Sequence, residues 1–194
     1  MSIYSFKNDY SSLAHPEVMK ALVEVLGEQY EGYGLDRHSI DAVDLIKKRL
    51  ERDDVDVHFV SGGTQANLVV LSSLLKPYEA VIACNSGHIA SHEAGAIENT
   101  GHKICTIDTF DGKLHVDDIE GILTKHIDEH MVKPKVVFIS QSTELGTIYS
   151  KEELEEIYTF CKENCLYLYI DGARFAVAVN SRDASLSYSY IEFM

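Results

Sequence analysis

The stretch from Leu166 to Arg174 places an acid and an arginine directly after a run of apolar and aromatic residues. Such a run is typical of a strand that is buried on both faces, in the middle of a parallel sheet. Asp171 then stands at the carboxyl end of this strand, the edge of an open α/β sheet where ligands bind. A half-desolvated carboxylate needs a cationic partner. That partner is either Arg174, in a plain ion pair, or a protonated ring nitrogen of a bound cofactor.

A glycine turn at Gly62 and Gly63 supplies a second group of candidates. We expect a strand over Val55–Val60 before the turn and a helix over 68–75 after it. Glycine lets backbone N–H groups approach an oxyanion, and a helix N-terminus adds partial positive charge. The two glycines and Thr64 are therefore candidates for holding a phosphate. The turn is not a P-loop, since no Lys-Ser or Lys-Thr pair follows the glycines, and many such turns bind nothing.

His88 is a third candidate, because it lies just beyond the strand predicted over Glu79–Cys84. Its imidazole can stack on a flat ligand at the sheet edge, or it can simply cap a turn. His92 follows four residues later, so on a helix the two imidazoles share one face. No third ligand is near them in the sequence, and we therefore expect no metal site.

Polar stretches follow four predicted strands, at residues 61–67, 86–93, 141–146 and 171–174. The alternation of strands and helices predicts a three-layer, mostly parallel α/β sheet, so that these stretches meet at one edge. An anion-binding turn, a stacking histidine and an acid near an arginine suggest a flat, phosphorylated ligand that can be protonated. Pyridoxal phosphate (PLP) has these properties.

The N-terminal part is expected to hold two amphipathic helices, which begin near Pro16 and Ile40. In the loop between them Tyr33 stands between two glycines. Its ring either lines a pocket or fills space between elements, and the space-filling role is the commoner of the two.

The composition narrows the class of protein. The chain has 194 residues, with 17 Lys and Arg against 31 Asp and Glu, for a formal charge of −14. This acidity argues against nucleic acid or an anionic membrane as a partner. The four cysteines form no CxxC pair, which is typical of thiols in a reducing cytosol. No run suits a signal peptide or a membrane span, so we expect a cytoplasmic enzyme or binding domain.

Six motifs, taken in order, resemble those of the threonine aldolase / aromatic amino acid β-eliminating lyase family, a group of fold-type-I PLP enzymes. The resemblance runs from Asn8 to about Val179. The motifs are the stretches 8–11, 33–36, 62–67, 87–89, 92–96 and 171–174.

The resemblance implies roles for the cofactor-binding candidates. The turn at Gly62, Gly63 and Thr64 would hold the phosphate, and His88 would stack on the pyridine ring. Asp171 would pair with the ring nitrogen and keep it protonated.

The resemblance also implies residues on the substrate side. Arg174 would contact the ring hydroxyl or the substrate carboxylate, and Asn8, Tyr33 and Glu144 would lie near the amino acid substrate. The family reaction cleaves a β-hydroxy-α-amino acid, such as threonine, into glycine and an aldehyde. A β-eliminating lyase on another amino acid, or non-catalytic binding of phosphate or PLP, is the alternative. Family members are homo-oligomers with shared active sites.

Two departures from the family pattern change what we expect. Glu144 stands where better-known aldolases have a histidine. The family's Schiff-base lysine follows the Asp-Gly-Ala-Arg stretch, yet no lysine occurs here after Lys162. The resemblance therefore implies that residues 1–194 form part of a large domain, without its last strands, this lysine or the C-terminal small domain. We expect little activity, an unpaired strand at Val55–Val60, and a tendency to aggregate.

Overall fold

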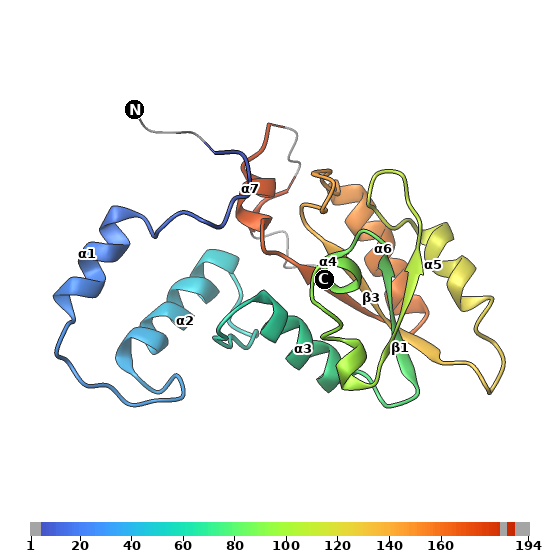
Figure 1. The fold of residues 1–194 in the computed structure, drawn as a ribbon, viewed down its shortest axis with the longest axis horizontal. Helices are drawn as coiled ribbons and strands as arrows, with labels where there is room; N and C mark the ends of the chain where they lie inside the picture. The colour runs from blue at the N-terminus through green and yellow to red at the C-terminus, as the bar shows by residue number, and fades with distance from the viewer. Residues whose placement is uncertain (1–4, 183–185, 189–194) are drawn as a thin grey trace. The chain divides into compact units, whose positions relative to one another are not determined.

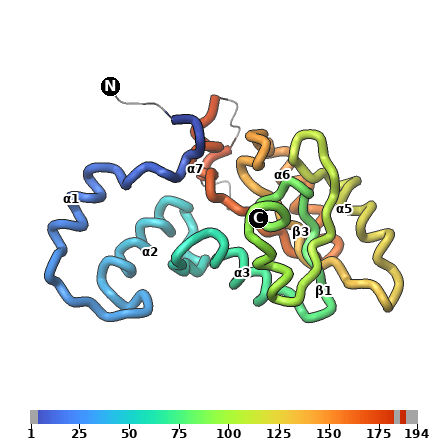
Figure 2. Tube along the Cα trace, viewed as in Figure 1, coloured from blue at the N-terminus to red at the C-terminus, as the bar shows by residue number. Residues whose placement is uncertain are grey.

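The computed structural model describes residues 5–182 and 186–188, and the chain divides into two compact units, Met1–Ala42 and Val43–Met194. Figure 2 follows the chain through each unit. The elements over the described residues are α1 (Pro16–Glu24), α2 (Arg37–Leu50), α3 (Gly63–Leu74), β1 (Glu79–Cys84), α4 (His88–Ser91), the 3-10 turn η1 (Glu98–Thr100), β2 (Lys103–Ile107), α5 (Val116–Leu123), β3 (Lys133–Ser140), α6 (Lys151–Glu163), β4 (Tyr167–Asp171) and α7 (Phe175–Val179).

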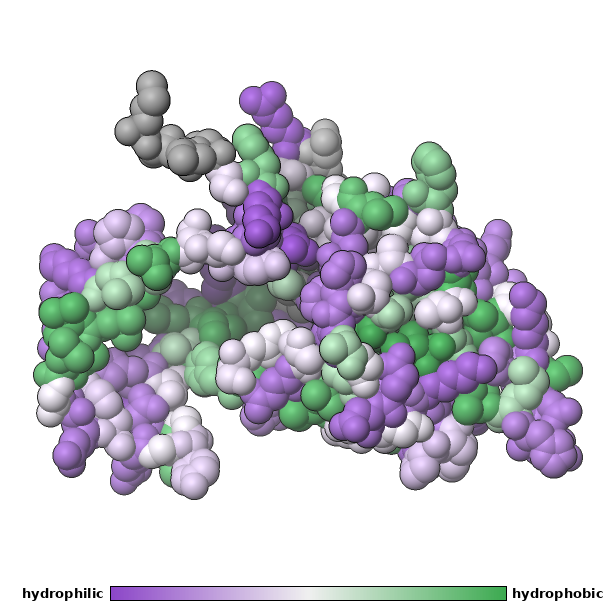
Figure 3. Space-filling view, viewed as in Figure 1, coloured by the Kyte–Doolittle hydropathy of each residue, from purple (hydrophilic) through white to green (hydrophobic). Residues whose placement is uncertain are grey.

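The first unit holds α1 and the start of α2, as the sequence predicts. Pro16 opens α1, and the His15 imidazole accepts a hydrogen bond from the Glu17 N–H at 3.3 Å, which caps the helix. All nine residues of α1 are described and none is buried. Its apolar side chains, Val18, Met19, Leu22 and Val23, are exposed, and Figure 3 shows apolar surface gathered over this helix.

The helix α2 crosses the boundary between the two units. Asp36 stands directly before it and accepts hydrogen bonds from the Ser39 N–H at 2.9 Å and the Ser39 hydroxyl at 2.6 Å. These bonds satisfy a donor of the first turn and lower the pKa of Asp36. The loop before the helix turns through left-handed conformations at Tyr33 and Gly34, with φ of 63° and 76°.

The second unit is built on a parallel four-stranded sheet in the order β2-β1-β3-β4 (Figure 1). The strand β1 has a neighbour on each side and helices packed on both faces, and all six of its residues are buried. Alternate residues of β1 then point to opposite faces. Ile82 packs in a cluster with residues of α5 and α6, whereas Val81 packs in a cluster with residues of α3 and α4. The predicted three-layer arrangement is therefore confirmed.

Two strand predictions differ from the structure. Val55–Val60 forms no strand, because no described segment pairs with it, and its Phe59 and Val60 are 53% and 45% exposed. The strand β4 was expected to be buried on both faces. It instead pairs with β3 alone among the described strands, so it lies at an edge and Tyr167 is 47% exposed.

The helix considered for His88 and His92 is short. It is α4, which spans four residues, and His92 is its C-cap. A capping box forms at the start of α6: Ser150 accepts from the Glu153 N–H, and Glu153 accepts from the Ser150 N–H. No helix within the described residues has the length and apolar character needed to cross a membrane.

Candidate active site

Asp171 ends β4 at the carboxyl edge of the sheet, as predicted. It is in register with Ser140, the last residue of β3. One carboxylate oxygen, Oδ1, accepts a hydrogen bond from the Ala173 N–H at 3.0 Å, which turns the chain back over the strand end. The side chain is half-buried. Its orientation is thus set by the chain that follows it, and a polar group is held at the edge where ligands bind.

The predicted glycine turn opens α3. Gly62 precedes the helix, Gly63 is its first residue, and a Cβ added at either would meet no other heavy atom within 4 Å. Among the described residues no side chain caps this first turn. The side-chain oxygen of Gln65, Oε1, instead accepts from both the N–H and the hydroxyl of Ser61, each at 2.7 Å. The exposed Thr64 and the open backbone leave the first N–H groups of α3 accessible to an anion.

His88 is the first residue of α4, directly after the turn that follows β1. Gly87 permits this turn, since a Cβ there would lie 3.0 Å from the Cys84 carbonyl oxygen. The Nδ1 atom of His88 lies 2.9 Å from Glu93 Oε1, and the Glu93 side chain is fully buried. The imidazole of His92 lies nearly parallel to that of His88, with ring centroids 5.7 Å apart and an interplanar angle of 17°.

A buried amide links these groups. Asn67, on the inner side of α3, is 1% exposed. Its Nδ2 donates to Glu93 Oε1 at 2.5 Å and to Asp171 Oδ2 at 3.3 Å, and the Tyr169 hydroxyl donates to its Oδ1 at 2.7 Å. His88 and Asp171, which are 83 positions apart in the sequence, are therefore joined through two side chains.

The sequence reasoning assigned no role to Asn67, Glu93 or Tyr169. A signal was present, because Asn67 interrupts an apolar face that continues at Leu71 on α3 and at Leu75, its C-cap. An amide on the inner face of a helix needs a hydrogen-bonding partner. The identity of that partner depends on which loops meet at the sheet edge, and only the folded structure determines which loops meet there.

Arg174 and Glu144 also meet at this edge. The Nη1 atom of Arg174 lies 3.5 Å from Glu144 Oε2, and their side chains are 33% and 16% exposed. Because Glu144 follows β3 and Arg174 follows the neighbouring β4, the parallel pairing of these strands brings the two side chains together.

Asn8 and Tyr33 lie in the first unit. The Asn8 side-chain oxygen accepts from the Tyr10 N–H at 3.3 Å and the Ser11 N–H at 3.0 Å, and so closes a local turn. The Tyr33 ring is fully exposed. Their contact with a substrate stays a prediction.

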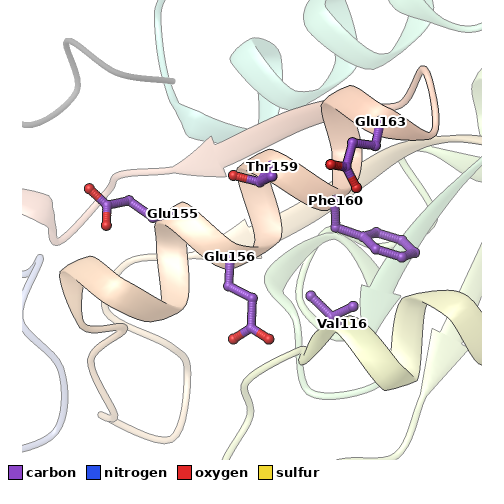
Figure 4. A pocket seen from close by; sticks show the side chains of 6 residues that line it. All are labelled: Val116, Glu155, Glu156, Thr159, Phe160 and Glu163. Carbon is purple, nitrogen blue, oxygen red and sulfur yellow. The ribbon is translucent and has the colours of Figure 1, made fainter.

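A surface pocket of about 360 Å³ lies elsewhere in the second unit (Figure 4). None of the predicted site residues lines it. Its walls come from α5 and α6, and its carboxylates are spread along one helix and do not converge. The lining residues are Val116, Glu155, Glu156, Thr159, Phe160 and Glu163.

Comparison with known families decides what kind of protein this is. The model of the beta-eliminating lyase family matches residues 6–191. The chain belongs to this family. The family is one of PLP-dependent lyases and aldolases, as the resemblance in the sequence predicts.

Two curated relatives that the chain resembles are threonine aldolases. The low specificity L-threonine aldolase of Pseudomonas aeruginosa is 37% identical over 175 residues, which are 89% of this chain and 50% of the relative. That of a Pseudomonas species is 38% identical, with the same coverage. This chain thus spans about half the length of these relatives.

Similarity to solved structures identifies the fold. The threonine aldolase of Leishmania major is 52% identical, with a TM-score of 0.95 over 97% of this chain and 55% of that one. An aromatic aminotransferase of Pyrococcus horikoshii is 22% identical, with a TM-score of 0.67 over 89% of this chain and 45% of that one, and it shows the fold alone. The fold is that of the fold-type-I PLP-dependent enzymes.

Proposed function

We propose that this chain forms the cofactor-binding part of a PLP-dependent carbon–carbon lyase of the threonine aldolase type. Such an enzyme cleaves a β-hydroxy-α-amino acid, such as threonine, to glycine and an aldehyde. The observation that carries the proposal is the chain of hydrogen bonds from His88 through Glu93 and Asn67 to Asp171. It joins His88, the candidate for stacking on the pyridine ring of PLP, to Asp171, the candidate partner of the pyridine nitrogen.

Asp171 suits the pyridine nitrogen of PLP. Its carboxylate is half-buried at the strand end and already oriented by the Ala173 N–H. An anion in such a place favours the protonated form of a nitrogen that faces it. When bound, PLP supplies an electron sink for the charge left on the substrate carbon as the bond to Cβ breaks. The role of Asp171 is to keep the ring nitrogen protonated throughout.

The first turn of α3 suits the phosphate. The two glycines leave open space over the backbone, and the helix N-terminus adds partial positive charge. Gly62, Gly63 and Thr64 would hold the phosphate through N–H groups and one hydroxyl. The orientation of α3 supports this role, because Asn67 of the same helix contacts Asp171 directly.

Arg174 would bind the substrate carboxylate or the ring hydroxyl. Its ion pair with Glu144 holds the guanidinium beside the strand end, with a third of the side chain exposed. Glu144 would then lie near the substrate, and substrate contact by Asn8 and by Tyr33 stays a separate prediction. A homo-oligomer is part of this proposal, as in the family.

A second candidate is binding of PLP or phosphate without catalysis. It is favoured by one observation: within these 194 residues no lysine follows Lys162. A lysine bonds covalently to the cofactor and exchanges it for substrate. We therefore propose that the residues described here supply non-covalent contacts to PLP.

A titration of the 194-residue chain with PLP tests both candidates. We expect the visible absorbance of PLP to shift and saturate. Saturation should need more PLP in Asp171→Asn and the same amount in Asp117→Asn, a substitution of an exposed carboxylate at the start of α5. Borohydride treatment and mass spectrometry should show no adduct at a unique lysine. Absence of binding would contradict the cofactor role, and a unique lysine adduct would contradict the non-covalent one.

Product analysis separates the reactions. The aldolase proposal predicts that any turnover of threonine yields glycine and acetaldehyde. Release of ammonia and a keto acid would instead favour β-elimination. Binding of PLP with neither set of products, even at high protein concentration, would favour the non-catalytic candidate.

A further inference from the structure

The Asn67 side chain bridges two carboxylates. Its Nδ2 atom carries two hydrogens, and it donates to Glu93 Oε1 at 2.5 Å and to Asp171 Oδ2 at 3.3 Å. Two carboxylates that approach one another would ordinarily repel, and burial makes that repulsion more costly. The Asn67 amide donates one hydrogen to each carboxylate and so stabilises both negative charges at once.

Tyr169 determines which way this amide faces. Its hydroxyl donates to Asn67 Oδ1 at 2.7 Å, so the Nδ2 group must face the carboxylates. Burial, and then the charges of Asp171 and Glu93, raise the pKa of Tyr169 to about 12. The phenol therefore stays protonated and remains a donor at neutral pH. Its ring is fixed in turn by an edge-to-face contact with Phe138, with centroids 5.5 Å apart.

Glu93 extends the same arrangement to His88. Its Oε1 atom lies near both Asn67 Nδ2 and His88 Nδ1. Its Oε2 atom is buried and has no hydrogen-bond partner among the described residues. The Glu93 carboxylate thus contacts the His88 ring through Oε1, and Asn67 holds that same oxygen from the other side.

We propose that Asn67, oriented by Tyr169, is a positioning residue that fixes the Asp171 carboxylate and the His88 imidazole relative to one another. Its meaning for catalysis rests on the proposed function, because only there do His88 and Asp171 contact the same cofactor. The geometric claim is independent of any cofactor. A purely structural Asn67 would support the packing of α3 on the sheet without affecting the His88 ring.

Two variants test the proposal. Tyr169→Phe deletes only the hydroxyl that orients the amide, and it retains the ring and its contact with Phe138. Asn67→Ser leaves a side chain too short to reach both carboxylates. The matched control is Tyr167→Phe, which removes a hydroxyl from the same strand at an exposed position.

The first readout is the imidazole ¹⁵N and ¹H spectrum of the cofactor-free protein, with His88 assigned by its absence in His88→Gln. We expect Tyr169→Phe to shift the His88 signals and Asn67→Ser to shift them further, with the signals of Tyr167→Phe at the wild-type positions. If Tyr169→Phe is folded and its His88 signals match those of Tyr167→Phe, the proposal is wrong.

The second readout is the dissociation constant for PLP. Loss of one orienting hydrogen bond should raise it by about 2- to 10-fold in Tyr169→Phe and leave it unchanged in Tyr167→Phe. An unchanged constant in Tyr169→Phe would contradict the proposal. If the wild type does not bind PLP, the proposed function fails, and the His88 spectrum still decides the role of Asn67.

Discussion

Arg174 Nη1 lies 3.5 Å from Glu144 Oε2, and this ion pair joins the loops that follow β3 and β4. Neither partner is fully buried, so the pair is worth only about 0–1 kcal/mol of stability. Its position at the strand ends suggests that it holds the guanidinium ready for an anionic ligand.

Substitution of Arg174 should therefore affect binding more than folding. We expect Arg174→Ala to lower the free energy of unfolding by about 1 kcal/mol or less, while it raises the dissociation constant for PLP by roughly tenfold. Glu144→Gln should lower the free energy of unfolding by a similarly small amount and leave PLP binding nearly intact. Urea unfolding and absorbance titration measure the two effects. A large loss of stability in Arg174→Ala with unchanged PLP affinity would assign the pair a structural role only.

Gly63 offers a sharper separation of binding from stability. An added Cβ would meet no atom within 4 Å, and no left-handed φ is required there, so Gly63→Ala should fold normally, with stability unchanged or raised by up to about 1 kcal/mol. The methyl group would occupy the space in which we place the phosphate. We expect affinity for PLP to fall by roughly tenfold or more, about 1.4 kcal/mol. Gly121→Ala on α5, where there is also open space, is the control, and equal affinities in the two variants would exclude the phosphate site.

Acid should destabilise the protein in part through Glu153. Burial alone would raise the pKa of this carboxyl, but hydrogen bonds from the Lys113 ammonium and the Ser150 N–H outweigh it and hold the pKa below its ordinary 4.5. A carboxyl whose pKa is lower in the folded state stabilises the protein above its unfolded pKa. That contribution disappears as the pH falls through the folded value.

The Glu153→Gln variant isolates this contribution. It should be less stable than the wild type at pH 7, and its stability should fall less steeply with acid below about pH 4.5. Urea unfolding as a function of pH measures both slopes, with Glu156→Gln, an exposed neighbour on α6, as the control. Parallel curves for Glu153→Gln and the wild type would show that Glu153 carries no such linkage.

The segment 55–60 should promote association of the 194-residue chain. Phe59 and Val60 are about half exposed in an apolar stretch that no described strand pairs with. Phe59→Ser should reduce aggregation, seen as a larger monodisperse fraction in light scattering, with a change in unfolding free energy of about 0.5 kcal/mol or less. His58→Ser, at an exposed polar position, should change neither quantity. Unaltered aggregation in Phe59→Ser would locate the cause elsewhere, for example on the exposed face of α1.

How far the sequence determines this structure differs from element to element. The strands β1 and β3 could be predicted because their apolar runs are long and have neighbours on both sides, so that burial and pattern agree. The capping box at Ser150 is a local signal that depends only on residues three positions apart. The apolar pattern at 55–60 is equally clear, yet a strand needs a pairing partner, and the described residues provide none.

In the candidate site, too, some features could be predicted from the sequence and others could not. The positions of Asp171 and His88 could be predicted, since Asp171 ends an apolar strand and His88 lies one turn beyond another. The link between them could not, because it depends on how α3 lies across the sheet. Residues 67 and 169 are brought together only by that packing, and nothing in their local sequence indicates the bond between Asn67 and Tyr169.

The central claim is that Asp171 binds the ring nitrogen of PLP. The most direct test is the ¹⁵N NMR signal of PLP labelled at that nitrogen, measured on the protein between pH 6 and 9, a range of about three units around neutrality. We expect the shift of a protonated pyridinium across this range in the wild type and that of a neutral pyridine in Asp171→Asn. A neutral ring nitrogen in the wild type, or a protonated one that persists in Asp171→Asn, would contradict the claim.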